Sequence, residues 1–196
     1  MSTVYTIGHS AHSFETFAGL LAGNGIEVVV DTRSAPYSKF APQFDRAALQ
    51  RDLAASAIKY LFLGEELGGR PKGDSFYDIN GRVLYGKRTS DPTFLAGMDR
   101  LERGMVQFRV ALLCGEEDPA HCHRRLMIGR VLVERGHQLL HIRADGHIDT
   151  EAEVALESKK PLAAAQPALF AELDEDQWRS TASVLPKKAP ANSSAQ

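Results

Sequence analysis

The sequence predicts an α/β protein with a three-layer, Rossmann-like (flavodoxin-like) fold, in which helices flank a mostly parallel sheet of about five strands. Two observations lead to this fold class. Short apolar runs of β-favouring residues alternate with longer segments of helical period, which is typical of parallel α/β proteins. Polar and ionisable residues also follow most of the predicted strands directly, as they do at the ligand-binding edge of such sheets.

Five segments are expected to be strands because they are short, apolar and rich in β-branched or aromatic residues. They are residues 3–7, 27–31, 59–63, 107–114 and 138–142. The intervening segments carry apolar residues at helical spacing, so each strand is expected to connect to the next through a helix.

Four helices are expected, each with a recognisable start or end. The first follows Ser13 as N-cap, and the second spans about 45–57 with Leu49, Leu53 and Ala57 facing inward. The third begins at Asp91-Pro92, where an N-cap precedes a proline in the first helical position, and is expected to end at Gly104. The fourth runs from about 124 to 134 and ends at Gly136.

Domain organisation follows from changes in composition along the chain. Residues 1–148 are expected to form a single α/β domain, in which the glycine-rich and charged segment 64–89 has no regular structure. Residues 149–179 are expected to be a helical C-terminal extension. Residues 180–196 are rich in proline, alanine, serine and lysine and are expected to be a disordered tail.

Composition excludes several classes of protein. With 43% hydrophobic and 24% charged residues, the chain resembles an ordinary globular protein, and its net charge of −2 gives no global attraction to nucleic acid or membranes. There is neither a secretory signal nor an apolar run of membrane-spanning length. We therefore expect a cytoplasmic protein whose two cysteines are free thiols. The sequence does not indicate the oligomeric state.

Candidate site residues lie just past the strand ends. His9 follows the first strand, Asp31 and Arg33 follow the second, Gly68-Gly69 follows the third, and Cys114 and Glu116 follow the fourth. Each also has a structural explanation: the ion pair can brace a loop, His9 can cap a helix, the glycines can permit a tight turn, and Cys114 can be a small core residue.

The stretch Cys114–Arg125, CGEEDPAHCHRR, favours a chemical role. A strand that ends in cysteine and leads through a polar loop into a helix can stabilise a thiolate, with help from His123 and Arg124. Such a site suits an anion or nucleophilic attack by sulfur. Phosphatase loops, however, place an arginine after five intervening residues, whereas nine separate Cys114 from Arg124 here and three of these are acidic. A phosphatase is therefore disfavoured.

Cys122 adds two alternatives. It can act as a second thiol that resolves a sulfenic acid or forms a reversible disulfide with Cys114. Alternatively, Cys114, Cys122, His123 and His9 can bind a metal such as zinc, but an adjacent Cys-His pair is a poor match to the usual ligand spacing. We therefore predict no metal and no cofactor from the sequence.

The segment 70–88 offers a different kind of partner. It contains five basic residues and two acidic ones, interleaved with aromatic residues: Arg70, Lys72, Arg82, Lys87 and Arg88, Asp74 and Asp78, and Phe76, Tyr77 and Tyr85. The alternatives are a solvated loop whose aromatic residues close over the core and a surface that binds nucleic acid.

These motifs, taken in order, resemble a bacterial and archaeal family described as domain of unknown function 488. The resemblance covers about residues 3–147 and rests on TIGHS (6–10), Phe14, Leu20, VVDTR (29–33), PQF (42–44), LGG (67–69), ALLCGEEDPAHCHR (111–124) and HI (141–142). It points to the candidate residues already named and to His123 and Arg124, but it implies no reaction. Thr32 departs from the family pattern, which commonly has a hydrophobic residue there.

The leading hypothesis is an enzyme, a thiol-dependent transferase or hydrolase, that acts on a small anionic or nucleotide-like ligand at the carboxyl edge of the sheet. Arg33 and Arg124 would hold the anion, and Cys114 would be the nucleophile or redox thiol. His9, Asp31 and Glu116 would handle protons. The alternatives are a nucleic-acid-binding or processing protein that uses segment 70–88 and a non-catalytic interaction module in which the strand-end residues brace loops.

Overall fold

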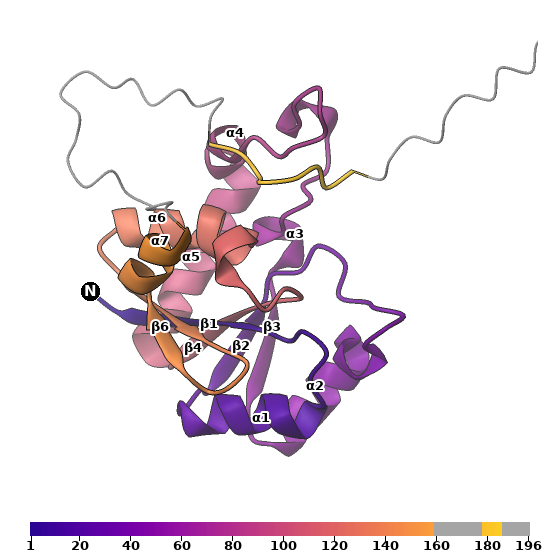
Figure 1. The fold of residues 1–196 in the computed structure, drawn as a ribbon, viewed down its shortest axis with the longest axis vertical. Helices are drawn as coiled ribbons and strands as arrows, with labels where there is room; N and C mark the ends of the chain where they lie inside the picture. The colour runs from indigo at the N-terminus through magenta and orange to yellow at the C-terminus, as the bar shows by residue number, and fades with distance from the viewer. Residues whose placement is uncertain (159–177, 186–196) are drawn as a thin grey trace, which may run out of the picture.

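The computed structural model describes residues 1–158 and 178–185 and contains a six-stranded sheet in the order β3-β2-β4-β1-β5-β6 (Figure 1). The strands are β1 (Thr3–Gly8), β2 (Val28–Asp31), β3 (Lys59–Phe62), β4 (Val110–Cys114), β5 (Gln138–Ile142) and β6 (Ile148–Thr150). Neighbouring strands pair in parallel except for β6, which pairs antiparallel with β5. The five predicted strands are all present. β6 was not predicted, because three residues give too short a pattern.

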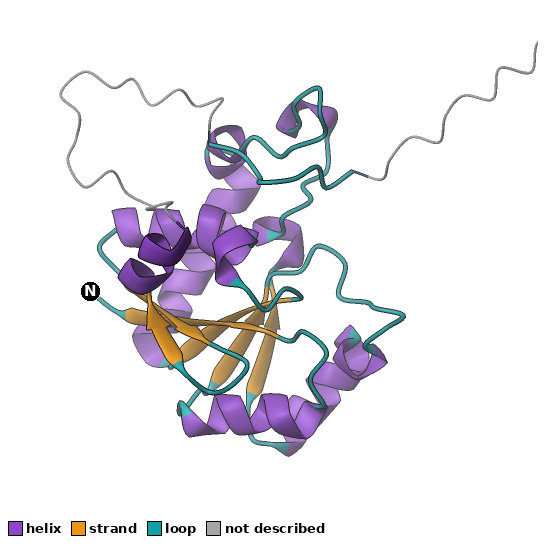
Figure 2. Ribbon diagram, in the orientation of Figure 1, coloured by secondary structure: helices purple, strands orange, loops and turns teal. Residues whose placement is uncertain are grey.

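Helices cover both faces of the sheet and produce the predicted three-layer architecture (Figure 2). The helices α1 (Phe14–Gly23) and α2 (Arg46–Ala55) lie on one face. The helices α5 (Pro92–Gln107) and α6 (Arg130–Glu134) lie on the other. The chain is therefore an α/β protein with a Rossmann-like three-layer fold.

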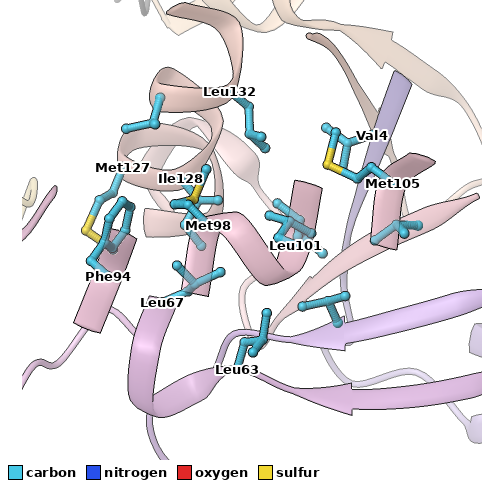
Figure 3. Close-up of a cluster of buried hydrophobic side chains, with 14 of the residues drawn as sticks. Val4, Leu63, Leu67, Phe94, Met98, Leu101, Met105, Met127, Ile128 and Leu132 are labelled. Carbon is cyan, nitrogen blue, oxygen red and sulfur yellow. The ribbon is translucent and has the colours of Figure 1, made fainter. Parts of the chain in front are cut away.

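Alternation along the strands divides the core into two clusters. In β1, Val4 packs among the residues of α5 and α6, whereas Tyr5 and Ile7 face α1 and α2. Figure 3 shows the first cluster, in which side chains of α5 such as Phe94 and Met98 meet Met127 and Ile128. Because both faces of the sheet are buried, the central strands are mostly apolar, and their buried polar residues include Thr6 in β1 and Asp31 at the end of β2.

The strand order brings three strand ends together. The chain runs from β1 to β2 and then to β3 at the edge, and it returns to insert β4 between β2 and β1. This order differs from the flavodoxin order 2-1-3-4-5. Because the chain reverses direction across the sheet after β3, right-handed crossovers place the later helices α5 and α6 on the face opposite to α1 and α2. The carboxyl ends of β1, β4 and β2 consequently lie side by side at the point where strand order reverses.

Two predicted helix starts are confirmed and one predicted end is wrong. Ser13 accepts a hydrogen bond from the Thr16 amide, and Asp91 accepts hydrogen bonds from the amides of Thr93 and Phe94. Helix α5 continues past Gly104 to Gln107, since Gly104 lacks the positive φ of a helix-ending glycine and Met105 is still packed in the core. The predicted strand 107–114 therefore begins only at Val110.

The second and fourth predicted helices also differ in detail. Helix α2 ends at Ala55, and Ala57 is exposed with a positive φ of 58° rather than facing inward. The fourth helix begins as a π-helical turn, Arg124–Gly129, and becomes α-helical only in α6. A π-turn inside a helix often marks a functional site. Gly136 follows α6 with a φ of 82°, as expected of a C-terminal glycine.

The segment 64–89, predicted to be irregular, contains three short helical turns. They are α3 (Gly64–Leu67), the 3-10 turn η2 (Asp74–Phe76) and α4 (Tyr85–Thr89). Tyr85 and Arg88 of α4 are buried, so this segment packs against the domain rather than extending into solvent.

The C-terminal part of the chain is described only in pieces. Helix α7 (Glu151–Ser158) forms the start of the predicted helical extension, and the remainder up to residue 177 lies outside the described residues. Residues 178–185 run beside α4, where the Ser180 amide donates to the Val83 carbonyl and the Val184 amide donates to the Gly81 carbonyl (Figure 1). In the described part of the chain, no helix combines the length and apolarity needed to cross a lipid bilayer.

Candidate functional site

The loops after β1 and β4 are joined directly at the carboxyl edge. The His9 amide donates to the Cys114 carbonyl and the Ser10 amide donates to the Gly115 carbonyl, each at 3.0 Å. Gly8 is required at this crossing, because a Cβ there would lie 1.9 Å from the Glu116 carbonyl oxygen. The β4 loop therefore lies directly over the end of β1.

A cleft of about 660 Å³ opens at this edge. Candidate residues from four strand ends line it: His9, Arg33, Gly69, Cys114, Glu116 and His123. Its remaining walls include Ser34, Arg70 and Tyr85 and the C-terminal residues 180–184. Strand ends that are distant in sequence thus share one cavity of the size that small-molecule sites have.

The two cysteines converge on one histidine nitrogen. Nδ1 of His123 lies 3.7 Å from Sγ of Cys114 and 3.8 Å from Sγ of Cys122. Both thiols are free and buried, and Cys114 lines the cleft whereas Cys122 is 0% exposed. The two ends of the stretch Cys114–Arg125 therefore meet, and they form the only group of three potential soft metal ligands among the described residues.

His123 is held in place by two contacts. Its Nε2 donates to the Thr32 carbonyl at 3.0 Å, which directs Nδ1 toward the sulfurs. Gly69 packs against the His123 side chain, since a Cβ at Gly69 would come within 2.8 Å of Cγ and 2.9 Å of Nδ1 of His123. Gly69 therefore serves to let His123 approach, and any larger residue there would displace the imidazole.

The two thiols of the cluster differ in acidity: the pKa of Cys114 is lowered and that of Cys122 is raised. A hydrogen bond with Cys122, together with the charge of His123, holds the pKa of the Cys114 thiol well below its usual value despite burial. Burial raises the pKa of Cys122, so this residue stays a thiol. Burial alone would lower the pKa of His123, but the Cys114 thiolate outweighs it and raises that pKa. The pair therefore favours a thiolate beside an imidazolium.

Asp31 and Arg33 form an ion-paired brace next to this cluster, in which both carboxylate oxygens of Asp31 are paired. Two nitrogens of Arg33 donate to the two carboxylate oxygens of Asp31, at 2.9 Å and 2.6 Å, and the Arg33 amide donates to Asp31 as well. The Tyr60 hydroxyl and the Phe44 carbonyl complete the arrangement, since Tyr60 donates to Asp31 and Phe44 accepts from Arg33. The Asp31 side chain is fully buried, so it positions the loop and does not reach the cleft.

Arg124 is also a brace. Its guanidinium donates to the carbonyls of Glu116 and Glu117 and, through Nε at 3.3 Å, to the Thr6 hydroxyl. Its side chain is buried and does not line the cleft. Instead of contacting a ligand as predicted, Arg124 holds the β4 loop over the sheet.

Comparison with known protein families identifies the chain's relatives. The family model described as "Domain of unknown function DUF488" matches residues 13–131, more than half of the chain. The chain belongs to the DUF488 family. The comparison with curated proteins and the comparison with solved structures gave no match.

The DUF488 match covers part of the site described above. Asp31, Arg33, Gly69, Cys114 and His123 fall inside the matched residues, whereas His9 precedes them. The family description carries no reaction, so the chemistry of this DUF488 domain has to be inferred from the site itself.

Two further predicted site residues of this DUF488 domain, His9 and Glu116, differ in burial: His9 is buried and Glu116 is exposed. His9 is stacked on Phe44 with ring centroids 4.5 Å apart, and its Nδ1 is bonded to the Ser10 carbonyl. Burial lowers the pKa of His9, so the ring is neutral and its Nε2 lies near Gly115. Glu116 lines the cleft but is exposed, so the burial that would make it a general base is missing.

Gly68 packs against protein rather than a ligand. A Cβ at Gly68 would come within 2.2 Å of the Gly64 carbonyl and 2.3 Å of the Ser34 hydroxyl. The Ser34 hydroxyl in turn accepts a hydrogen bond from the Arg70 amide at 2.8 Å. Gly68 therefore allows the close turn that brings Arg70 to the cleft.

The basic segment of the DUF488 domain presents less charge than its sequence indicates. Arg88 is buried, pairs with Asp91 at 2.8 Å and donates to the carbonyls of Glu65 and Glu66. Arg82 is half-buried, which leaves Arg70, Lys72 and Lys87 as the exposed basic residues. Nucleic-acid binding through this segment stays a prediction, and no observation favours it over the cleft.

Sequence reasoning missed two contributors to the site. Tyr85 lines the cleft, and burial raises the pKa of its phenol, so the hydroxyl stays protonated near the thiols. The Thr32 carbonyl orients His123, and the Thr32 hydroxyl donates to the Leu113 carbonyl at 2.8 Å. A backbone carbonyl leaves no signal in a sequence, whereas Tyr85 was visible as an aromatic residue but was assigned to the basic loop.

Proposed function

We propose that this DUF488 protein is a thiol-dependent enzyme in which Cys114 attacks a small anionic ligand bound in the cleft. The observation that carries the proposal is the Cys114–His123 pair at the cleft wall, with the far nitrogen of the imidazole fixed by a backbone carbonyl. A cysteine paired with an oriented histidine is the usual arrangement of nucleophilic thiol enzymes.

The proposed step needs only groups that the site contains. Sγ of Cys114 forms a bond to the electrophilic atom of the ligand, and the bond from that atom to its leaving group breaks. The leaving group takes the electron pair and receives the proton from Nδ1 of His123. Water or a second substrate then displaces the sulfur, so the same site serves a hydrolase or a transferase.

Cationic groups at the cleft support an anionic ligand. Arg33 lines the cleft, and among the described residues its Nη1 has no hydrogen-bond partner, whereas its other nitrogens are committed to the brace. Arg70 lines the cleft as well and is exposed. Together they can offer donors to a carboxylate, sulfonate or phosphate group, and Glu116 on the same wall selects against highly charged anions.

The proposal is tested by comparing two alkylating agents on metal-free protein, neutral iodoacetamide and anionic iodoacetate. Cys114 should react faster than free cysteine at neutral pH, and Cys114→Ser should lose this labelling. Arg70→Glu should slow iodoacetate more than iodoacetamide. The matched control is Lys72→Glu, the same charge change two residues away at an exposed position that does not line the cleft.

Two results would overturn the proposal. A Cys114 that reacts no faster than free cysteine would exclude a nucleophilic thiolate. Equal effects of Arg70→Glu and Lys72→Glu on iodoacetate would show that the cleft has no preference for anions beyond the general charge of the surface.

A further inference from the structure

The geometry of the thiol cluster points to a second use of the same atoms. We propose that Cys114, Cys122 and His123 form a binding site for a soft divalent cation such as Zn²⁺, with its fourth coordination position facing the cleft. The proposal rests on the positions of three ligand atoms and does not require the proposed function.

The separations between these atoms match those of a tetrahedral zinc site. With zinc–sulfur bonds of about 2.3 Å and zinc–nitrogen bonds of about 2.0–2.1 Å, neighbouring S and N ligands are roughly 3.6 Å apart. Nδ1 of His123 lies 3.7 Å from one sulfur and 3.8 Å from the other, and all three atoms lie within 4.8 Å of one another. Both sulfurs therefore lie at ligand-to-ligand distance from the same nitrogen, as a shared cation requires.

The surroundings of His123 are those of a metal ligand. Zinc-bound histidines almost always donate their other ring N–H to a carbonyl or carboxylate, which fixes the tautomer. Nε2 of His123 donates to the Thr32 carbonyl in this way at 3.0 Å. Because Nε2 keeps its hydrogen, Nδ1 of a neutral ring presents a lone pair to the two sulfurs.

Local backbone geometry removes the objection that adjacent residues are poor ligands. Cys122 has an extended backbone, with φ −100° and ψ 141°, and His123 is the first residue with helical angles, with φ −60° and ψ −26°. This change of direction lets two neighbouring side chains converge instead of pointing apart. The spacing argument against a metal assumed that they could not.

The chemistry of the ligand set favours zinc-like ions over hard cations. Two sulfurs and one imidazole suit Zn²⁺ or Co²⁺, whereas Mg²⁺ and Ca²⁺ prefer oxygen ligands. Within the described residues the group has three protein ligands, of which Cys114 and His123 line the cleft. Because the cation would withdraw electron density from the Cys114 sulfur and occupy the space beside it, metal binding should slow nucleophilic attack by this thiolate.

The test is a Co²⁺ titration of reduced, chelator-treated full-length protein under anaerobic conditions. We expect one ion per chain, intense visible bands of tetrahedral cobalt and a near-ultraviolet thiolate-to-cobalt band, all lost on addition of Zn²⁺. Cys122→Ser should weaken binding more than about 100-fold, since even outer-shell changes cost 10–100-fold. His121→Ala is the control, because His121 lines the same cleft but does not belong to the group.

A second readout is the alkylation of Cys114, and its first part uses the unmodified protein and so does not depend on the folding of a variant. Zn²⁺ should protect Cys114 of the unmodified protein from iodoacetamide. In Cys122→Ser this protection should be lost, so that the rates of Cys114 labelling with and without Zn²⁺ become equal. The absence of tetrahedral thiolate bands, or bands and protection that Cys122→Ser leaves unchanged, would overturn the metal site.

The two proposals fail separately in this experiment. If Cys114 is reactive in metal-free protein but Zn²⁺ gives no protection, the thiol mechanism survives and the metal site is wrong. If cobalt binds through both thiolates but metal-free Cys114 is no more reactive than free cysteine, the metal site survives and the thiol mechanism is wrong.

Discussion

Two polar clusters lie side by side at the carboxyl edge of the sheet and differ in how completely their atoms are paired. In the cluster around Asp31, both carboxylate oxygens accept hydrogen bonds, from Arg33 and Tyr60. In the cluster around Cys114, two thiols share one imidazole nitrogen at the wall of a cleft. The Asp31 carboxylate is fully paired and therefore structural, whereas the second cluster has capacity left for a ligand.

Thr32 connects the two clusters. It lies between Asp31 and Arg33 in the chain, and its carbonyl accepts the hydrogen bond that orients His123. The Asp31 cluster would therefore contribute to the proposed chemistry indirectly, by fixing the backbone that orients His123. Mutations in the first cluster should be felt mainly as loss of stability, and mutations in the second mainly as loss of thiol reactivity.

Removing Asp31 should give the largest effect. Asp31→Ala leaves the buried Arg33 guanidinium unpaired, and breaking a buried pair in this way costs about 3–5 kcal/mol of unfolding free energy. Urea denaturation followed by circular dichroism measures the change. Tyr60→Phe is the graded control, because it removes a single hydrogen bond and should cost about 1 kcal/mol. A loss at Asp31 no larger than that at Tyr60 would refute the structural brace.

Changing His123 should separate reactivity from stability. His123→Gln removes the charge beside Cys114, so the pKa of the thiol should rise and its alkylation rate at neutral pH should fall about tenfold or more. Mass spectrometry of iodoacetamide-treated protein measures the rate, and His121→Ala, on the same cleft wall, should leave it unchanged. Equal rates in His123→Gln and the unmodified protein would remove His123 from the mechanism.

A smaller effect, on the pH dependence of the free energy of unfolding, is expected from replacing His141. This residue is buried and lies outside both clusters. His141 contacts the Thr6 hydroxyl at 2.8 Å and Glu151 at 3.2 Å, and burial lowers its pKa from 6.5. The native state thus binds fewer protons than the unfolded state as pH falls below about 6.5. The stability that the neutral ring contributes is present above that value and is lost as pH falls toward the native pKa, by at most about 1.4 kcal/mol per pH unit.

The measurement is the free energy of unfolding at pH 7.5 and pH 5.5 for the unmodified protein and for His141→Gln. The variant should lose less stability between the two pH values because glutamine does not titrate. His9, whose pKa is also lowered by burial, contributes equally to both proteins and cancels in the difference. An identical pH dependence in the two proteins would contradict a neutral buried His141.

The fold class and the residues that line the cleft were largely predictable from the sequence. The alternation of apolar strands and helices depends on local periodicity, and parallel strands place their carboxyl ends at one edge, which brings His9, Arg33 and Cys114 together. The roles of residues were less predictable. Asp31 was expected to handle protons and Arg124 to hold an anion, but their hydrogen bonds go to protein atoms that only the folded chain brings near.

Other features left no usable pattern. A glycine inside a helix and a glycine that ends one look alike in a sequence, and Gly104 is of the first kind because its φ is not positive, so the predicted end of α5 was wrong. The convergence of Cys122 and His123 on Cys114 depends on a change of backbone direction that residue spacing does not encode. The Thr32 carbonyl acts through backbone geometry, which any residue type would provide.

The central claim is that Cys114 is held as a reactive thiolate by His123, and the pH dependence of its alkylation tests this most directly. In metal-free protein, the rate of iodoacetamide labelling of Cys114 should remain high well below the pH at which free cysteine loses reactivity, because the pKa of this thiol is lowered. His123→Gln should shift the profile to higher pH. A profile for the unmodified protein that coincides with that of free cysteine, or is shifted to higher pH, would contradict the account.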